Sequence, residues 1–245
     1  FDNEKWAHLV EVAPYWISST AVTNRQFEEF VNDGGYVKRH LWTPEGWEWK
    51  TKTNASHPLY WVMGNGSDWM VKWFDQTLLL EPYHPVVHVS WYEAMAYCKW
   101  ANRRLPTEAE WEIAASSESS VTDKSNNPKI GLYPWGDEFP NATLANLNCV
   151  NHGPIDVRDL PMGESKFGCR QMIGNTWEWT GDPFWPYPGF LLDPYKEYSA
   201  PWFGNHKVLR GGCWATRSRL IRNTWRNFYL PERRDIYAGF RTCTI

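Results

Sequence analysis

Three helix starts constrain the fold of this chain more than any other feature, because each carries a capping box. In a capping box, a Ser or Thr is followed three residues later by Gln or Glu, and the two side chains satisfy free backbone donors at the helix start. The pairs are Thr23 with Gln26, Ser90 with Glu93, and Thr107 with Glu110. We therefore expect short helices over about 24–31, 91–102 and 108–115, the first ended by Gly34 and Gly35.

The rest of the chain predicts few and short strands. Residues 86–89 and 207–210 are the clearest candidates, followed by 11–18 and 238–242. Residues 116–129 are polar and are expected to form a surface loop, whereas 177–203 is a long, aromatic and Pro-rich loop of the kind that usually serves function. With no internal repeat and no linker, residues 1–245 are expected to form one α+β domain with little regular secondary structure.

Composition excludes several classes of function. A net charge of −3 gives no basic footprint for nucleic acid, and no apolar run approaches the length of a membrane span. Five cysteines without a CxxC motif favour reduced thiols and a cytoplasmic protein. The 18 tryptophans fit either a packed core or an aromatic-walled pocket.

Six segments, in order, resemble one known family. They are residues 89–94 (VSWYEA), 104–115 (RLPTEAEWEIAA), 133–137 (YPWGD), 174–180 (GNTWEWT), 209–212 (LRGG) and 238–241 (AGFR). Together they resemble the formylglycine-generating-enzyme (sulfatase-modifying factor) superfamily. The resemblance implies a variant of the C-type lectin fold, which agrees with the scarcity of predicted helices and strands.

The resemblance also indicates a branch of that superfamily. Formylglycine-generating enzymes bind copper(I) through two cysteines after the Arg-Gly-Gly turn, and the matching positions here hold Thr216 and Ile221. Residues 222–237, together with 186–190, 193–199, 202–204 and 46–49, are similar instead to EgtB and OvoA, the sulfoxide synthases of ergothioneine and ovothiol biosynthesis. Those enzymes use iron(II) and O2 to join the thiol of cysteine or gamma-glutamylcysteine to the imidazole of histidine or trimethylhistidine.

Several site residues follow from this resemblance. Asn227 would bind the carboxylate of the histidine substrate, and Phe228 would pack beside its methylated amine or its ring. Tyr229 departs from the pattern, because some EgtB proteins have an acid there to hold the amine of the sulfur donor, so the donor stays undetermined. A pocket tyrosine would donate a proton near oxygen, and the candidates are Tyr187, Tyr195 and Tyr198.

Four arginines form a dense group in the same stretch of sequence, namely Arg222, Arg226, Arg233 and Arg234. Guanidinium forks bind carboxylates in bidentate geometry, so one or two of these arginines could face a substrate. The alternative is internal ion pairing with Glu232 and Asp235. The sequence alone leaves both interpretations open.

The resemblance implies two kinds of metal. Iron(II) would be held by three histidines of an N-terminal helical bundle that is not part of this chain. His84 and His88 do not replace them, because four residues of a strand span roughly 13 Å. A structural calcium would be bound near Gln171, Gly174, Thr176 and Glu178, the middle two through main-chain oxygens.

Two hypotheses remain. In the first, the chain is the catalytic and substrate-binding domain of a sulfoxide synthase and is inactive without the helical bundle. In the second, the same lectin-like fold is a non-catalytic module that binds a ligand or a protein. Formylglycine generation is not expected, because the copper cysteines are missing.

Overall fold

The computed structural model describes residues 1–66, 68–116, 118–122 and 128–245. Its helices are α1 (Asn24–Asn32), α2 (Pro44–Thr53), α3 (Trp91–Trp100) and α4 (Glu108–Ala114), with short 3-10 turns at Asp2–Glu4, Arg39–Leu41, Pro161–Gly163, Ala200–Trp202 and Ser218–Leu220. Its strands are β1 (Trp61–Met63), β2 (Trp69–Trp73), β3 (Gln76–Leu79), β4 (Arg103–Arg104), β5 (Glu118–Thr122), β6 (Pro128–Ile130), β7 (Trp177–Pro183), β8 (Lys207–Arg210), β9 (Asn227–Tyr229), β10 (Ala238–Gly239) and β11 (Cys243–Thr244). The α+β class with little regular structure is confirmed.

All three expected helices are present, and each begins at its capping box. Both hydrogen bonds of the box form at Thr23, Ser90 and Thr107. Helix α2 was not expected, because its cap residue Thr43 is followed by Gly46 at the third position and so lacks the Glu or Gln of a full box. Its signals are Pro44 in the first turn and Asn54, whose left-handed backbone ends the helix.

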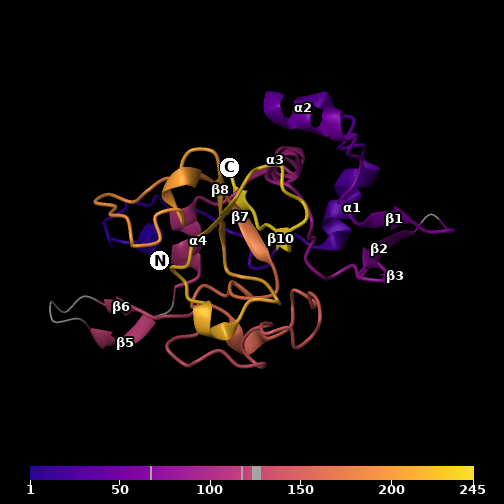
Figure 1. The fold of residues 1–245 in the computed structure, drawn as a ribbon. Helices are drawn as coiled ribbons and strands as arrows, with labels where there is room; N and C mark the ends of the chain where they lie inside the picture. Colours follow the sequence, from indigo (N-terminus) through magenta and orange to yellow (C-terminus); the bar gives the residue numbers. More distant parts are fainter. Residues whose placement is uncertain (67, 117, 123–127) are drawn as a thin grey trace.

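A four-stranded sheet lies at the centre of the molecule, with the strand order β10-β7-β8-β9 (Figure 1). Strands β7, β8 and β9 are antiparallel, whereas β10 runs parallel to β7. Helix α4 packs against β7 and β8. Trp179 of β7 lies opposite Leu209 of β8, and both side chains are fully buried, so this sheet is part of the main core.

A second sheet, of order β1-β2-β3, projects beside α1 at the edge of the molecule (Figure 1). Trp61, Val71 and Leu78 lie opposite one another across its three strands. Trp61 is buried in the main core, while all four residues of β3 are exposed. Trp69 and Trp73 of β2 are partly buried against the same core, so the sheet joins the core through β1 and β2 and exposes β3.

Several expected strands differ in the structure. The strand at 207–210 is confirmed as β8, and 238–242 contributes the two residues of β10. Residues 86–89 do not form a strand. His88 has a left-handed backbone (φ 62°), and the N–H of Val86 donates one hydrogen bond to the carbonyl oxygen of Val22. In 11–18, only Ile17 forms a bridge, to Cys243. Whether such a segment becomes a strand depends on the segments that pair with it, and the local sequence does not show that pairing.

Two expected loops also contain strands. Residues 118–122 and 128–130 pair as the hairpin β5–β6, while 117 and 123–127 of the expected surface loop lie outside the described residues. The aromatic stretch 177–203 begins with the seven residues of β7. In the described part of the chain, no helix is long and apolar enough to cross a membrane.

Candidate functional site

The Arg-Gly-Gly turn after β8 is built around glycine. Gly211 and Gly212 both have left-handed backbones (φ 92° and 76°), and a side chain at Gly211 would collide with the carbonyl oxygen of Met172. The chain leaves the sheet here and returns as β9, so that Asn227 lies opposite Leu209. Strand β9 is the edge strand of the central sheet.

Asn227 offers a free amide donor at this edge. Its side chain is half-buried, and its Oδ1 accepts a hydrogen bond of 2.9 Å from the backbone N–H of Phe228. Its Nδ2 donates to no group in the described part of the chain. With the oxygen fixed by the backbone, the N–H2 group has a defined direction and can donate to a carboxylate.

Phe228 belongs to an aromatic cluster. Its ring stacks on Phe184 with centroids 4.0 Å apart, and Tyr198 and His206 meet it edge-on at 6.0 and 5.8 Å. Phe184 therefore covers one face of the ring. The other contacts place Phe228 beside Tyr198 of the 184–203 loop and beside His206, which follows it.

Arg226, the residue before Asn227, is held by a buried ionic network. Its guanidinium bonds to both carboxylate oxygens of Glu108 at 2.7 and 3.0 Å, and to the carbonyl oxygens of Asn3 and Trp185 at 2.7 and 3.1 Å. Because four donors of Arg226 are used inside the protein, its role in this structure is to fix β9. It thereby positions the neighbouring Asn227.

The network extends to Arg210 at the end of β8. Arg210 donates to Glu108 at 2.7 Å and to Glu112 at 2.5 Å. Burial alone raises the pKa of Glu108, but Arg210 and Arg226 outweigh it and hold the pKa below its usual value. Glu108 thus stays ionised and ties α4 to β8 and β9.

The sequence did not indicate Glu108 or Arg210 as part of the site. An acidic residue in the first turn of a helix is common for its effect on the helix dipole. Its partners Arg210 and Arg226 lie 102 and 118 residues away. Only the position of Arg210 before the two glycines could have drawn attention to it.

The other three arginines have separate partners. Arg222 is 3.8 Å from Glu4, Arg233 forms two bonds to Asp235 at 2.5 and 2.7 Å, and Arg234 donates to Glu93 at 3.0 Å. The guanidinium of Arg233 lies 5.1 Å from the ring of Tyr229. The four arginines are thus near in sequence but are each paired with a different carboxylate, Glu108 in the case of Arg226.

One of the three candidate tyrosines, Tyr198, lies in the aromatic cluster, and Tyr187 adjoins it through Arg226, whose guanidinium also lies 5.0 Å from the ring of Phe184. The ring of Tyr187 is 4.0 Å from the guanidinium of Arg226, and Tyr198 contacts Phe228. Burial raises the pKa of both hydroxyls, so each stays protonated at neutral pH. Tyr195 is 65 % exposed and touches the cluster only through Tyr198, at 6.0 Å.

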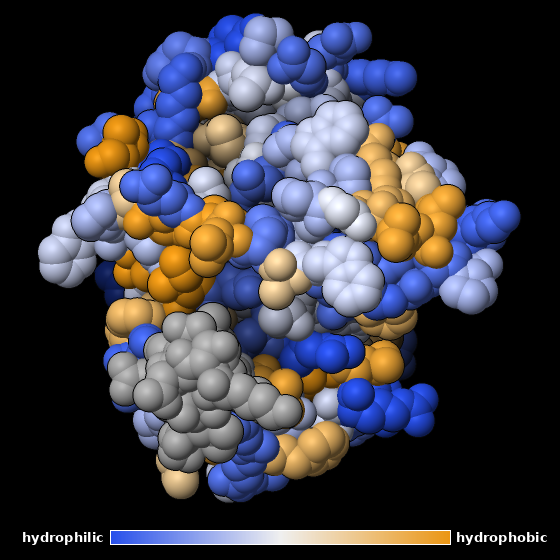
Figure 2. All heavy atoms as spheres, turned by 90° about the vertical axis from the view of Figure 1, so that its left-hand side faces the viewer, coloured by the Kyte–Doolittle hydropathy of each residue, from blue (hydrophilic) through white to orange (hydrophobic). Residues whose placement is uncertain are grey.

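The first residues of the chain cover this cluster. Asn3 donates to Ser199 at 2.9 Å, and Lys5 pairs with Asp193 at 2.9 Å. Figure 1 shows this start of the chain beside the loop that follows β7. On that side of the molecule, hydrophobic side chains form separate patches among hydrophilic ones (Figure 2). Leu191 and Leu192 of the loop are both exposed.

The four residues expected to bind calcium do not fit the ion as they are placed. Both oxygens of Glu178 accept from Arg241, at 2.6 and 2.8 Å, and one also accepts from Trp111 at 2.7 Å. Gln171 donates to the carbonyl oxygens of Asp156 and Asp159 and accepts from Asn175. Thr176 N donates to Gly174 O at 2.8 Å. The single carboxylate of the set is thus already neutralised by a buried arginine.

Thr216 and Ile221, the positions that the resemblance pairs with copper-binding cysteines, lie together in space. A methyl group built on Gly212 would be 3.3 Å from Oγ1 of Thr216 and 2.8 Å from Cδ1 of Ile221. Thr216 Oγ1 accepts from the backbone of Cys213 at 3.0 Å, and Ile221 is buried. A hydroxyl and an aliphatic side chain provide no thiolate for copper(I).

Three comparisons with known proteins agree on the family. The model of the sulfatase-modifying factor enzyme 1-like domain matches residues 1–244. Hercynine oxygenase of Mycobacterium tuberculosis is 39% identical over 241 residues, which are 98% of this chain and 55% of that protein. Formylglycine-generating enzyme of Streptomyces coelicolor is 31% identical over 271 residues, 98% of this chain and 81% of that protein.

Among solved structures, PvdO from Pseudomonas aeruginosa shares the fold, with a TM-score of 0.58 and 20% identity, over 94% of this chain and 80% of that one. This chain spans about half the length of the hercynine oxygenase that it matches. The fold, the ordered motifs and the match over residues 1–244 lead to one conclusion: the chain belongs to the sulfatase-modifying factor enzyme 1-like domain family.

Proposed function

We propose that residues 1–245 form the substrate-binding domain of an iron(II)- and O2-dependent sulfoxide synthase. The reaction joins the thiol of cysteine or gamma-glutamylcysteine to an imidazole carbon of histidine or trimethylhistidine. One oxygen atom of O2 ends on the sulfur, and the other leaves as water with the thiol and imidazole hydrogens, so atoms balance. The similarity to hercynine oxygenase and the absence of cysteines at 216 and 221 support this choice over formylglycine generation.

The free Nδ2 of Asn227 is the observation that carries the proposal. It donates to the substrate carboxylate, and the Arg226–Glu108 pair keeps its strand in place. Phe228 supplies an aromatic edge for the methylated amine or the imidazole. Tyr187 or Tyr198, both kept protonated by burial, donates a proton to oxygen.

The described residues contain no group of three His, Cys, Asp or Glu side chains placed to hold one ion. The described residues therefore provide no binding site for iron. In this proposal the iron ligands come from an N-terminal helical bundle, and the complete protein acts in the cytoplasm. What this chain contributes is binding and orientation of the amino-acid substrate.

A product assay on the complete protein tests this function. Protein from the native source, loaded with iron(II), is mixed in air with trimethylhistidine or histidine and with cysteine or gamma-glutamylcysteine, and the products are separated by mass spectrometry. A sulfoxide containing one added oxygen atom is expected from at least one pair of substrates. If no pair yields a sulfoxide while the protein still binds trimethylhistidine, the domain is a non-catalytic binding module.

A further inference from the structure

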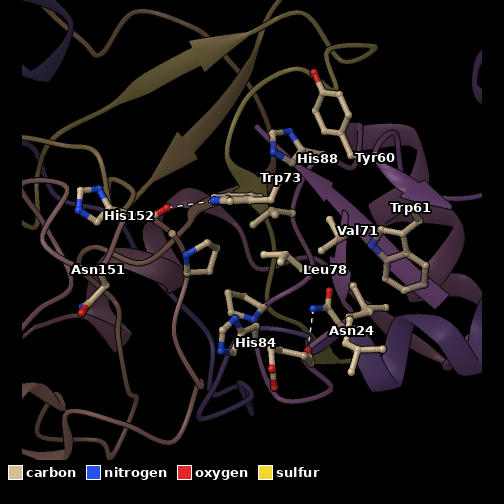
Figure 3. A pocket seen from close by; sticks show the side chains of 17 residues that line it. Asn24, Tyr60, Trp61, Val71, Trp73, Leu78, His84, His88, Asn151 and His152 are labelled. Carbon is tan, nitrogen blue, oxygen red and sulfur yellow. Dashed lines mark hydrogen bonds between the residues drawn. The ribbon is translucent and has the colours of Figure 1, made fainter. Parts of the chain in front are cut away.

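A cavity of about 300 Å³ lies on the side of the molecule that carries the sheet β1–β3 (Figure 3). One wall is the face of this sheet that bears Trp61, Val71 and Leu78, the residues opposite one another in its three strands. The other walls are the segment 81–88 and the loop 151–154. None of the substrate-site residues named above lines this cavity.

Most of the lining is apolar, and two of its polar side chains already donate to backbone carbonyl oxygens. Asn24 donates to the carbonyl oxygen of Glu81 at 2.8 Å, and the indole N–H of Trp73 donates to the carbonyl oxygen of His152 at 3.1 Å (Figure 3). Among the lining residues, Glu81 is the one with a carboxylate, and its side chain is exposed. The interior therefore presents no charge to a bound molecule.

His88 differs from these groups because one ring nitrogen is left open. It is only 4 % exposed, and its Nδ1 is 3.0 Å from the carbonyl oxygen of Arg234. A carbonyl oxygen can only accept, so Nδ1 carries the proton and Nε2 has the lone pair. Nε2 accepts no hydrogen bond from the described part of the chain.

Aromatic rings surround this nitrogen. Tyr60, Tyr237 and Trp73 have ring centroids 4.6, 5.2 and 6.2 Å from that of His88. In Figure 3, His88, Tyr60 and Trp73 group at one end of the cavity and His84 and Asn24 at the other. A second cavity, of about 290 Å³, adjoins this end and shares Tyr60, Trp73 and His88 as its wall. The backbone of His88 is left-handed, a conformation that bulky residues adopt mainly where the surroundings impose it.

We propose that this cavity binds a small, uncharged aromatic molecule that carries one N–H or O–H group, with that group donating to Nε2 of His88. A volume of about 300 Å³ is at the lower end of ligand pockets and suits one fused pair of rings. The flat walls of Trp61, Trp73 and Tyr60 provide stacking surfaces. The inference is independent of the sulfoxide synthase proposal, because it uses a different cavity and different residues.

Indole and benzothiophene form a matched pair of probes, since their ring systems have similar shapes and only indole has an N–H donor. Isothermal titration calorimetry on the protein is expected to show one saturable site for indole, with benzothiophene binding about ten-fold more weakly. His88→Asn keeps a residue that tolerates the left-handed backbone and removes Nε2. It is expected to weaken indole about ten-fold and to leave benzothiophene unchanged.

Two further variants test the location. Val71→Phe fills the cavity from the middle strand, and Leu78→Trp fills it from the exposed strand β3, where a change does not disturb the core. Binding of both probes is expected to be lost in either variant whose thermal unfolding matches that of the wild type. The inference is overturned if indole shows no saturable binding up to its solubility limit. It is also overturned if His88→Asn binds indole as the wild type does, or if the blocking variants keep full affinity.

Discussion

The guanidinium of Arg226 donates two hydrogen bonds to the carboxylate of Glu108, although the two residues are 118 positions apart. Both side chains are buried, and Arg210 donates to the same carboxylate. Glu108 is thus an anion shared by two buried cations, with Glu112 as a second partner of Arg210.

Replacing Glu108 with Ala is therefore expected to destabilise the protein by about 3–5 kcal/mol, because it leaves buried guanidinium groups without their counterion. Urea unfolding followed by circular dichroism measures the change. Glu29→Ala is the matched control: Glu29 is 3.9 Å from Arg25 in a pair that is largely exposed, and its loss should cost less than about 1 kcal/mol. Equal effects of the two substitutions would contradict the role of Glu108.

Protonation of His88 is expected to weaken the fold. Burial lowers the pKa of His88 from 6.5 to about 4, and the hydrogen bond to the backbone of Arg234 and the nearby Asp235 oppose this only in part. Between pH 6.5 and 4 the unfolded chain then binds more protons at this residue than the folded protein does, so stability falls as the pH falls through this range. The contribution is about 3 kcal/mol, from a pKa difference of about 2.5 units.

An NMR titration of the imidazole signals gives the pKa of His88 directly. Between pH 7 and pH 4, the free energy of unfolding should fall by about 3 kcal/mol more in the wild type than in His88→Asn. A pKa near 6.5 for His88, or the same pH dependence in both proteins, would refute the prediction.

Asn227 is expected to control binding of the histidine substrate. Asn227→Ala should weaken trimethylhistidine about ten-fold through loss of one hydrogen bond, and Asn227→Asp should weaken it further because two carboxylates would face each other. Calorimetry on the complete protein measures both affinities. Asn32→Ala, an exposed change at the end of α1, serves as the control and should bind as the wild type does. Unchanged binding in Asn227→Asp would remove Asn227 from the site.

Thr216→Cys combined with Ile221→Cys is expected to create a copper(I) site, because both side chains approach Gly212. Two neighbouring thiolates suit this soft ion, and one does not suffice. Because Sγ of the native Cys213 lies 3.7 Å from Oγ1 of Thr216, all variants carry Cys213→Ser as well. In that background, competition with a copper(I)-specific chelator should show one tightly bound ion in the variant with both new cysteines and none in either variant with one. Equal copper binding by a single variant would show that the two positions do not act as a pair.

Removal of calcium is expected to leave stability unchanged. Both carboxylate oxygens of Glu178 are occupied by Arg241, so the loop 171–178 has no free charge for the ion. Thermal unfolding in EDTA and in millimolar calcium should give the same Tm. A bound ion at 100 times its Kd would add about 2.7 kcal/mol, which a shift in Tm would reveal.

Local signals in the sequence predicted local structure well. Each capping box lies within four residues of chain, and all three helices start where the boxes predict. The strand at 86–89 shows the limit of such signals. Its apolar pattern resembles a strand, but its backbone groups bond to separate parts of the chain. The N–H of Val86 donates to Val22, and the carbonyl oxygens of His88 and Val89 accept from the backbone of Leu59 and the indole of Trp179.

The site shows the same limit at longer range. The sequence predicted Asn227, Phe228 and the aromatic loop as neighbours, and the structure brings Phe228 together with Tyr198. It also grouped four arginines and left open whether they face a substrate or pair internally with Glu232 and Asp235. In the structure each has its own carboxylate, and that carboxylate is Asp235 for Arg233 alone. Adjacent residues point in different directions, so closeness in sequence does not place guanidinium groups in one pocket. The aromatic cavity beside His88 depends on three separate segments and left no signal in the sequence.

The bond from Arg226 to the carbonyl oxygen of Asn3 joins residues 223 positions apart, and the bond from Asn3 to Ser199 spans 196. During synthesis on the ribosome, the start of the chain must therefore wait until nearly all of these residues have emerged before it can dock. Contacts of such long range form late in folding, after the helices and local turns. The region around Asn227 is consequently among the last parts of this domain to take its final form, and a nascent chain cannot hold a substrate there before the segment around Arg226 has left the ribosome.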